Sequence, residues 1–559
     1  MSSRCTRVLS IVCWIFTALE SAAAAQAGST PAAAPIRVDE TVDVKGDRSA
    51  PRADATLATV IDGAAAEAVP LNGRSFVPVI ALAPGVALPS GSAFPRINGG
   101  RPRTNEYLFD GISVLQPEPG QIAFLPVIDA IDQITIATNS PPAEFGRFNG
   151  GVVNVTMKAG SNAFHGDGFE FLRHEALNAR NAFAPTSVDP AKPRFRRSQF
   201  GGVLGGRVRA NRTFFFADFQ GTAQTIGRAA ISTVPTMLQR RGIFTEPIGG
   251  RVPVVYDPGT TTPLAGGRFS RRPFPGNTIP ADRIDAAALR LLERYPLPTS
   301  AGTANNYQRV ANEIDSQRQA DLRIDHRFSA RDQTFARLSI FDDDFTPVAP
   351  LPDGSGSIAG AATGPQHTRA LALASNYQRT IGGRGSNELR GGYTRRSVQR
   401  RGVEIPTIAI AGLQPLGSPP NTNTDFRTDV TQIWDAFTWA RGSHTWKAGL
   451  DFRWQRLDIM QPPSPYGSYR FSTLFTDLPG ATGTGSALAS FLLGQVETFS
   501  IDLQPKPIRP RAHSQEFFVQ DEWLAWERAR ERREGVPGVR RAALPSTPLR
   551  ASDSPPGER

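Results

Sequence analysis

The chain has 559 residues, two cysteines and a formal net charge of +11. Both cysteines, Cys5 and Cys13, lie near the N-terminus, so the chain beyond them cannot form a disulfide, a thiolate metal site or a cysteine nucleophile. The basic residues are nearly all arginines and are spread along the chain. A nucleic-acid-binding protein gathers its basic residues on one face, so this distribution argues against a nucleic-acid partner.

Residues 1–27 have the pattern of a cleaved signal peptide. Arg4 and Arg7 give a positive start, an apolar run extends from Val8 to Leu19, and Ala25-Gln26-Ala27 fits a cleavage site. The apolar run is too short to span a membrane as a helix, although an N-terminal anchor is the alternative interpretation. No later apolar run is long enough for a spanning helix. Barrel strands escape hydropathy analysis because their lipid-facing and lumen-facing residues alternate, so a membrane protein is still compatible with this sequence.

Residues 28–54 are predicted to be a linker. The segment from Gly28 to Pro35 is rich in alanine, glycine and proline, a composition typical of unstructured chain. A short β-prone stretch, Ile36 to Asp47, follows it. An extended segment of this kind can add as a strand to a partner protein, and an ordinary linker is the alternative.

Residues 55–160 are predicted to form a small α+β domain. Asn98-Gly99-Gly100 and Asp110-Gly111 suit turns that need positive φ. A strand is predicted from Ile131 to Thr138, because its apolar and polar residues alternate. The same alternation around Val155 predicts the last strand of this domain.

Two stretches of this domain carry a family resemblance. Pro95 to Ser113 reads PRINGGRPRTNEYLFDGIS, and Ile131 to Gly166 reads IDQITIATNSPPAEFGRFNGGVVNVTMKAGSNAFHG. Together they resemble the plug domain of a TonB-dependent outer-membrane receptor of the Oar-like group, running into the first barrel strand. The resemblance implies a mainly β fold, a transmembrane antiparallel β-barrel with an N-terminal α+β plug in its lumen. It implies a location in the outer membrane of a Gram-negative bacterium, reached by export.

The resemblance also implies partners and site residues. The partners are the TonB energy-transducing protein with its inner-membrane motor, outer-membrane lipid and an extracellular ligand; no cofactor and no metal are expected. The candidate TonB box, the extended segment that TonB binds, is Glu40, Thr41, Val42, Asp43 and Val44. In this family, charged plug residues pair with the barrel wall; the candidates are Arg74, Arg96, Arg101, Arg103, Glu106, Asp110, Glu144 and Arg147. Arg96 and Arg147 are the preferred ones, and ordinary surface arginines are the alternative. Hydrated pairs are individually weak, so a pull on the N-terminus could rearrange the plug.

Residues 161–523 are predicted to form the N-terminal part of the barrel. The clearest strand has Trp446, Ala448, Leu450, Phe452 and Trp454 on one face and Lys447, Gly449, Asp451 and Arg453 on the other. Its aromatic ends suit the two interfaces of a membrane barrel. We expect roughly ten strands of about ten residues each, where the family's full barrel needs about 22.

The predicted connections alternate in length, as they do in outer-membrane barrels, whose periplasmic turns are short and whose outer loops are long. Predicted turns are Arg209–Arg212, Ser329–Asp332, Ile381–Ser386 and Ala440–His444; predicted loops are Leu177–Arg197, Gly221–Arg318, Asp342–His367 and Ser397–Thr428. A helix is predicted from Pro280, with Ala288 and Leu292 among its apolar positions and Pro296 at its end. The glycine pairs at Gly201 and Gly205 are interpreted as strand positions close to the plug.

Residues 524–559 form an atypical tail. They are rich in arginine, proline and glutamate and lack strand alternation, so we expect a frameshifted or prematurely ended barrel; a native disordered tail is the alternative. No catalytic constellation occurs, which argues against an enzyme. Asp342-Asp343-Asp344 could hold Ca²⁺ in a loop, but a solvated acidic tip is preferred. The functional hypotheses are active uptake of a large or scarce ligand (an iron chelate, a glycan or a peptide), a surface adhesin or structural outer-membrane protein, and a non-functional transporter fragment.

Overall fold

The computed structural model describes residues 56–90, 92–117, 120–179, 192–358 and 363–523. The predicted signal peptide, the linker with the candidate box Glu40–Val44, and the tail at 524–559 all lie outside these residues. The described chain is mainly β, as predicted. Within it, no helix combines the length and the apolar character that crossing a membrane requires.

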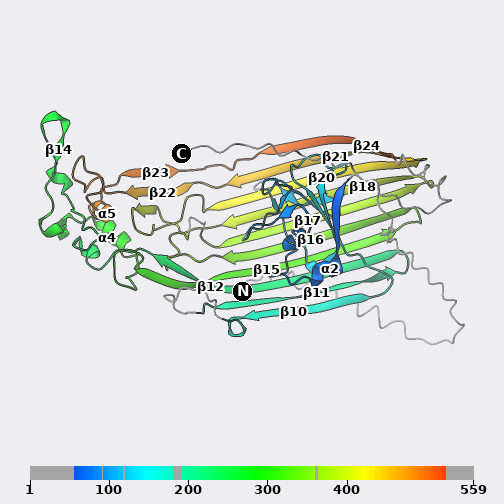
Figure 1. Ribbon diagram of the computed structural model, residues 1–559, viewed down its shortest axis with the longest axis horizontal. Coiled ribbons are helices and arrows are strands. Elements are labelled where there is room, and N and C mark those ends of the chain that lie inside the picture. Colours follow the sequence, from blue (N-terminus) through cyan, green and yellow to red (C-terminus); the bar gives the residue numbers. More distant parts are fainter. Residues whose placement is uncertain (1–55, 91, 118–119, 180–191, 359–362, 524–559) are drawn as a thin grey trace, which may run out of the picture. The chain divides into compact units, whose positions relative to one another are not determined.

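Ten antiparallel strands form one sheet, here called the wall, in which each strand pairs with the next one along the chain (Figure 1). These strands are β10 (His165–His174), β11 (Phe195–Arg209), β12 (Thr213–Ser232), β15 (Tyr307–Arg327), β16 (Asp332–Thr346), β17 (Gln366–Ile381), β18 (Gly385–Arg400), β20 (Thr424–Arg441), β21 (His444–Met460) and β24 (Arg511–Trp523). The predicted number of strands is confirmed. The predicted length is wrong, because the strands run from 10 to 21 residues.

The two faces of the wall differ in chemistry, as strand alternation predicts. On β21, Leu450 and Trp454 lie on the outward face, where Trp446 and Trp454 are largely exposed. Asp451 and Arg453 point to the opposite, inner face, where both are buried. Cross-strand register continues the pattern, since Leu450 opposes Phe517 of β24. The outward face is therefore an apolar band bordered by aromatic residues.

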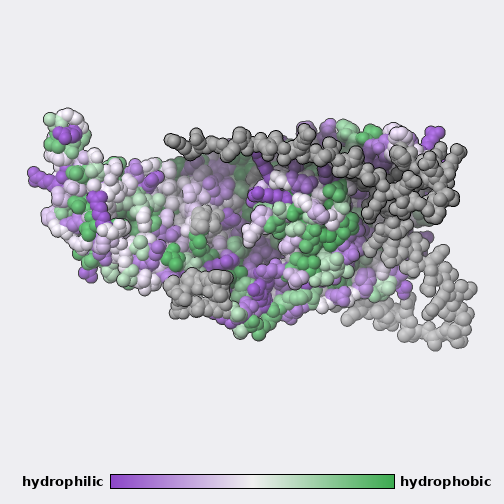
Figure 2. Space-filling model, in the orientation of Figure 1, coloured by the Kyte–Doolittle hydropathy of each residue, from purple (hydrophilic) through white to green (hydrophobic). Residues whose placement is uncertain are grey.

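A smaller, five-stranded sheet lies against the inner face. Its order is β1 (Leu57–Asp62), β8 (Ile131–Asn139), β9 (Val152–Met157), β4 (Glu106–Phe109) and β5 (Ile112–Ser113). We call residues 57–157 the N-terminal module; it also contains α2 (Gly63–Ala68), α3 (Val77–Ile80) and the pairs β2 (Val86–Ala87) with β3 (Arg96–Ile97) and β6 (Leu115–Gln116) with β7 (Gln121–Ile122). Its core includes fully buried Phe76 and Phe109. The strands predicted at 131–138 and around Val155 are confirmed. In the orientation of Figure 1, the space-filling view shows hydrophilic and hydrophobic side chains interleaved around this module (Figure 2).

The wall strands are joined by short turns at one end and long connections at the other. The turns are residues 210–212, 328–331, 382–384 and 442–443, close to the predicted ones. Three of the four long connections begin later and end earlier than predicted; β12, for example, continues to Ser232 and β15 begins at Tyr307. Asp342-Asp343-Asp344 consequently lies inside β16 and not in a loop.

The long connections form an ordered outer cap with its own hydrophobic core. Phe244, Leu416 and Phe491 are among its buried residues, and they come from three different connections. The cap contains β13 (Thr262–Pro263), β14 (Phe269–Ser270), α4 (Ala286–Leu292), β19 (Thr407–Ile410), β22 (Ser464–Phe471), α5 (Ala487–Leu492) and β23 (Thr498–Asp502). The predicted helix is real but begins at Ala286, because the Asp285 carboxylate caps it by accepting from the Ala287 and Ala288 amides.

Candidate functional site between the N-terminal module and the wall

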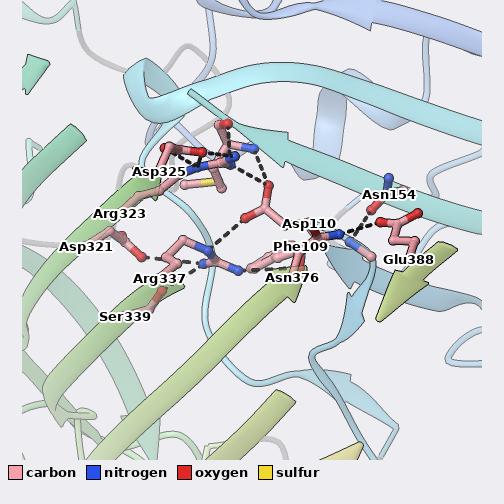
Figure 3. A network of polar contacts seen from close by, with 12 residues as sticks. Phe109, Asp110, Asn154, Asp321, Arg323, Asp325, Arg337, Ser339, Asn376 and Glu388 are labelled. Atoms are coloured by element: carbon pink, nitrogen blue, oxygen red, sulfur yellow. Dashed lines mark hydrogen bonds and ion pairs between the residues drawn. The ribbon is translucent and has the colours of Figure 1, made fainter. Parts of the chain in front are cut away.

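Asp110 is the centre of the contact between the N-terminal module and the wall (Figure 3). It occupies the β4–β5 turn with φ 51°, followed by Gly111 with φ 76°, so the predicted positive-φ turn is confirmed. One carboxylate oxygen, Oδ2, lies 2.8 Å from Nε of Arg337 on β16. The other, Oδ1, accepts from Arg323 of β15 at 3.1 Å and from the Met157 amide at 3.0 Å. A tight turn thus presents one carboxylate to two arginines of neighbouring strands.

Both arginines are held by further groups of the wall. Arg337 donates to Ser339 Oγ at 2.8 Å and lies 3.7 Å from Asp321. Arg323 pairs with Asp325 at 2.9 Å. The side chains of Asp110 and Arg337 are only 3% and 1% exposed, so this pair is buried and does not have the hydrated character that the sequence suggested. A buried pair that loses one partner by substitution leaves an uncompensated charge, so removal of either side chain is costly.

A second network is a closed ring around Glu106 on β4. Glu106 accepts from Ser113 Oγ at 2.5 Å and from Arg453 of β21 at 3.3 Å. Arg453 also donates to Asp451 at 2.8 Å. Gln432 of β20 closes the ring, since its amide donates to Asp451 and its oxygen accepts from the Ser113 amide. All five side chains of the ring are buried, and apart from Asp451 Oδ1 the module and the wall satisfy each other's polar groups here.

A third set of contacts is more exposed and joins the segment before β9 to the last two wall strands. Lys447 of β21 donates to Glu144 at 2.6 Å. Arg147 lies 3.0 Å from Glu516 of β24, and both of these side chains are 27% exposed. Gln520 of β24 accepts from the Ala143 amide at 2.8 Å.

The segment Leu71–Phe76 contacts the first wall strands. Asn72 accepts from Arg197 of β11 at 2.8 Å. Arg74 pairs with Asp129 inside the module, and its guanidinium stacks over Phe169 and Phe171 of β10 at 4.6 and 4.3 Å. A guanidinium over an aromatic face gains a cation–π attraction, so Arg74 joins the module to β10 without a wall carboxylate.

The remaining candidate residues lie elsewhere. Arg96 is exposed on β3 and makes no ion pair with any described residue. Arg101 is also exposed, and the Arg103 guanidinium stacks on Phe94 of the module at 4.2 Å. The sequence did not identify the wall residues Arg323, Arg337 and Arg453 as site residues. The only signal for them was their inward position in alternating strands.

Close backbone packing occurs at a glycine other than those predicted. A Cβ on Gly392 of β18 would lie 2.3 Å from Cγ2 of Ile112 in the β4–β5 hairpin. At Gly201 and Gly205 a Cβ would instead meet the wall's own residues, Phe219 and His165. Val203, which lies between the two glycine pairs, packs into the core of the module, so β11 does approach the module at these positions.

The described residues contain one group of three side chains that could hold a metal ion, Asp342, Asp344 and His367. It lies on the outward face of β16 and β17. The His367 ring contacts Asp344 at 2.8 Å and Asp342 at 3.7 Å through different nitrogens, and Arg369 already pairs with Asp342 at 3.2 Å. This arrangement is a cross-strand ion-pair network and is not preorganised around one cation.

The family of the chain follows from comparison with known proteins. The family model described as outer membrane beta barrel domain matches residues 156–528, which contain the complete wall. The chain belongs to this outer-membrane barrel family. In outer-membrane barrels, an outward apolar band of this kind is the face that meets lipid.

Individual relatives of the barrel protein are similar over parts of their length. The TonB-dependent transporter Oar of Myxococcus xanthus is 32% identical over 149 residues, which are 26% of this chain and 14% of that protein. The outer membrane transporter YddB from Escherichia coli has a TM-score of 0.49 at 14% identity, covering 83% of this chain and 54% of that one. A mutant of the ferric enterobactin receptor PfeA from Pseudomonas aeruginosa has a TM-score of 0.45 at 12% identity, covering 84% and 55%. The chain spans about half the length of these two solved receptors.

Proposed function

We propose that this chain is the plug and part of the barrel of a TonB-dependent outer-membrane receptor, which takes up a large or scarce ligand. In this proposal residues 55–160 are the plug and residues 161–523 belong to the barrel. The observation that carries it is the buried contact of Asp110 with Arg323 and Arg337, by which a separate N-terminal module is fixed to the inner face of a membrane wall. The similarity to the transporter Oar supports the same function.

These contacts suit a module that the wall holds firmly and that is released when force is applied to its N-terminal linker. Beside apolar contacts with Val203, Phe216, Ala370 and Ala372, its links to the wall include many ion pairs and hydrogen bonds, which are directional and are lost over a short displacement. Their replacement by water costs less than exposure of an apolar interface of the same size, because water solvates the separated charges. A pull on the N-terminal linker would therefore detach the module stepwise, from the partly buried pairs at Glu144 and Arg147 toward the fully buried ones.

The test of this function is whether the candidate box binds TonB by adding to it as a β-strand. The full chain, purified in detergent, is expected to bind the periplasmic domain of TonB, and a Val42→Pro variant is expected to lose binding because proline cannot donate to a ladder. Val38→Pro, outside the box, is the matched control and is expected to bind normally. Equal binding by all three proteins, or no binding by any, would contradict energised transport and favour the adhesin hypothesis.

A further inference from the structure

The outward face of the wall carries a groove in its apolar band. The groove has a volume of about 460 Å³, and its lining includes residues of β15, β16, β17 and β18. Its floor consists of small residues in one cross-strand row, since Ala336 opposes Ser375 and Ser375 opposes Gly391. Leu338 and Leu373 form the next row toward the outer cap. The floor lacks the large side chains that fill the rest of the band, so the groove is a slot at the lipid-facing surface.

Three arginines stand on the same face, just beyond the groove on the side of the outer cap. Arg395 of β18 is two residues from Tyr393, which lines the groove. Arg369 of β17 and Arg427 of β20 both oppose Ser397 of β18. Neighbouring strands are about 4.8 Å apart, so the three residues form a triangle with sides of roughly 5–10 Å.

Each of these arginines is oriented by an aspartate, and in each pair Nε is the nearest nitrogen. Arg369 Nε lies 3.2 Å from Asp342, and Asp429 lies 2.5 Å from Arg395 Nε and 3.3 Å from Arg427 Nε. The Arg395 side chain also interacts with Tyr393, whereas the terminal amines of Arg369 and Arg427 have no hydrogen bond with any described residue. The side chains remain 62%, 41% and 49% exposed. A guanidinium fixed in this way presents two parallel donors, the arrangement that matches a phosphate group.

From these two features we infer that the wall has a specific site for a phosphorylated outer-leaflet lipid, with the phosphate on the arginine triangle and one acyl chain in the groove. Gly391 and Arg395 are four residues apart, which corresponds to roughly 13 Å along the strand. One leaflet of the hydrocarbon core is about 15 Å thick, so the spacing suits one acyl chain. The long connections of outer-membrane barrels face the exterior, and the lipid of that leaflet carries phosphate groups. The inference rests on membership of the barrel family and does not depend on the proposed uptake.

The nearby carboxylates do not cancel this site. Asp342 and Asp429 are occupied by the arginines that they orient, and Asp344 is occupied by His367 at 2.8 Å. Arg456 of β21 opposes Asp429 and adds a fourth guanidinium, so four arginines stand against Asp342, Asp344 and Asp429 and leave a positive balance. Tyr393 strengthens the arrangement, since its hydroxyl donates to Asp429 at 2.7 Å while its ring borders the groove.

The wall itself offers a matched control for the test. Arg379 lies on the same strand as Arg369, is 61% exposed, and pairs through Nε with Asp332 of β16 at 3.7 Å. It stands at the short-turn end, four residues from Ser375 and on the side of the groove away from the triangle. Arg379→Gln therefore removes an equivalent arginine without touching the triangle.

The experiment measures binding of diphosphoryl lipid A, and of the same lipid with its phosphates removed, to the full chain in detergent micelles. The Arg369→Gln, Arg395→Gln, Arg427→Gln triple variant is expected to bind diphosphoryl lipid A about tenfold more weakly, because charge-assisted hydrogen bonds are lost. Its binding of the dephosphorylated lipid is expected to be unchanged. Gly391→Leu, which fills the slot, is expected to weaken both lipids, and Arg379→Gln neither. Far-UV circular dichroism and trypsin resistance verify that each variant is folded.

Three results would overturn the inference. If Arg379→Gln weakened the binding of diphosphoryl lipid A as much as the triple variant does, the lipid would be bound by general charge attraction and not by a site. Unchanged binding by Gly391→Leu would mean that no chain enters the groove. Full displacement of the lipid by inorganic phosphate would mean that the triangle binds the free anion and not a lipid.

Discussion

The Asp110 carboxylate lies 2.8 Å from the Arg337 guanidinium, and this contact joins a two-residue turn of the N-terminal module to the fifth strand of the wall. The turn brings the carboxylate to the wall because Asp110 and Gly111 both adopt positive φ, which lets β4 reverse directly into β5. Arg337 is in turn fixed by Ser339 and Asp321 on the wall. The Asp110 carboxylate is thus held in place by the module, and the Arg337 guanidinium is held in place by the wall.

Asp110→Asn is expected to lower the free energy of unfolding by about 3 kcal/mol, because buried Arg337 and partly buried Arg323 each lose one of the two carboxylates that compensate their charge. The loss should appear in the unfolding midpoint of the full chain in detergent, together with faster tryptic cleavage of the module. Arg96→Gln is the control and should change neither, since Arg96 is exposed. Equal behaviour of the two variants would mean that the Asp110 contact contributes no stability.

Gly392→Ala is expected to destabilise the chain by about 1–3 kcal/mol, because the new methyl group would overlap Ile112. The Gly392→Ala, Ile112→Ala double variant should be more stable than the sum of the two single changes predicts, since the smaller side chain makes room for the methyl group. Gly391→Ala is the neighbouring control. Its Cβ would meet only Ser375 Oγ, at 3.1 Å, and a nearly neutral effect is expected. Strict additivity in the double variant would show that Gly392 does not pack against Ile112.

The sequence predicts the local parts of this fold well. Alternation identifies the outward face of β21, and residue pairs such as Asp110-Gly111 identify a tight turn, because both signals depend on neighbours in the chain. Strand ends are predicted less well. β15 continues as far as Tyr307 through polar residues that alternation in hydropathy does not reveal.

The site is predicted only on its module side. Arg147 and Asp110 are candidates because they lie in motifs, whereas Arg323, Arg337 and Arg453 are three among many arginines at inward strand positions. Which of them meets the module depends on the register between two sheets, and that register is set by packing of distant segments. Arg96 is the opposite case: its motif makes it a candidate for pairing with the wall, but its side chain is exposed.

Tyr295→Phe tests the packing of the outer cap. Tyr295 is buried, and its hydroxyl donates to the Gln414 carbonyl at 2.7 Å. Loss of this hydrogen bond is expected to lower the free energy of unfolding by about 1 kcal/mol. Burial raises the pKa of Tyr295 above its ordinary value of 10.0, since it disfavours the phenolate. The unfolded chain therefore ionises first, so this contribution to stability is complete below about pH 10 and falls as the pH rises further. Protease resistance of the cap, measured on both sides of pH 10, should decline more in the wild type than in the variant. If protease resistance declined equally in the wild type and the variant, the pH dependence would not come from Tyr295.

A charge swap at the exposed edge of the module tests whether its contacts yield in order. Glu144→Lys places like charges beside Lys447, and it is expected to weaken docking of the edge segment by about 1 kcal/mol, because this pair is only partly buried. The Glu144→Lys, Lys447→Glu double variant restores an opposite pair and should recover most of the loss. Hydrogen exchange is the measurement, because it resolves the edge segment from the Asp110 turn. In Glu144→Lys, exchange should accelerate around residues 143–147 and stay slow at Gly111, since the buried contacts are independent of the edge. Equal acceleration at both places would mean that the module detaches as one cooperative unit, and stepwise release by a pull on the linker would then be wrong.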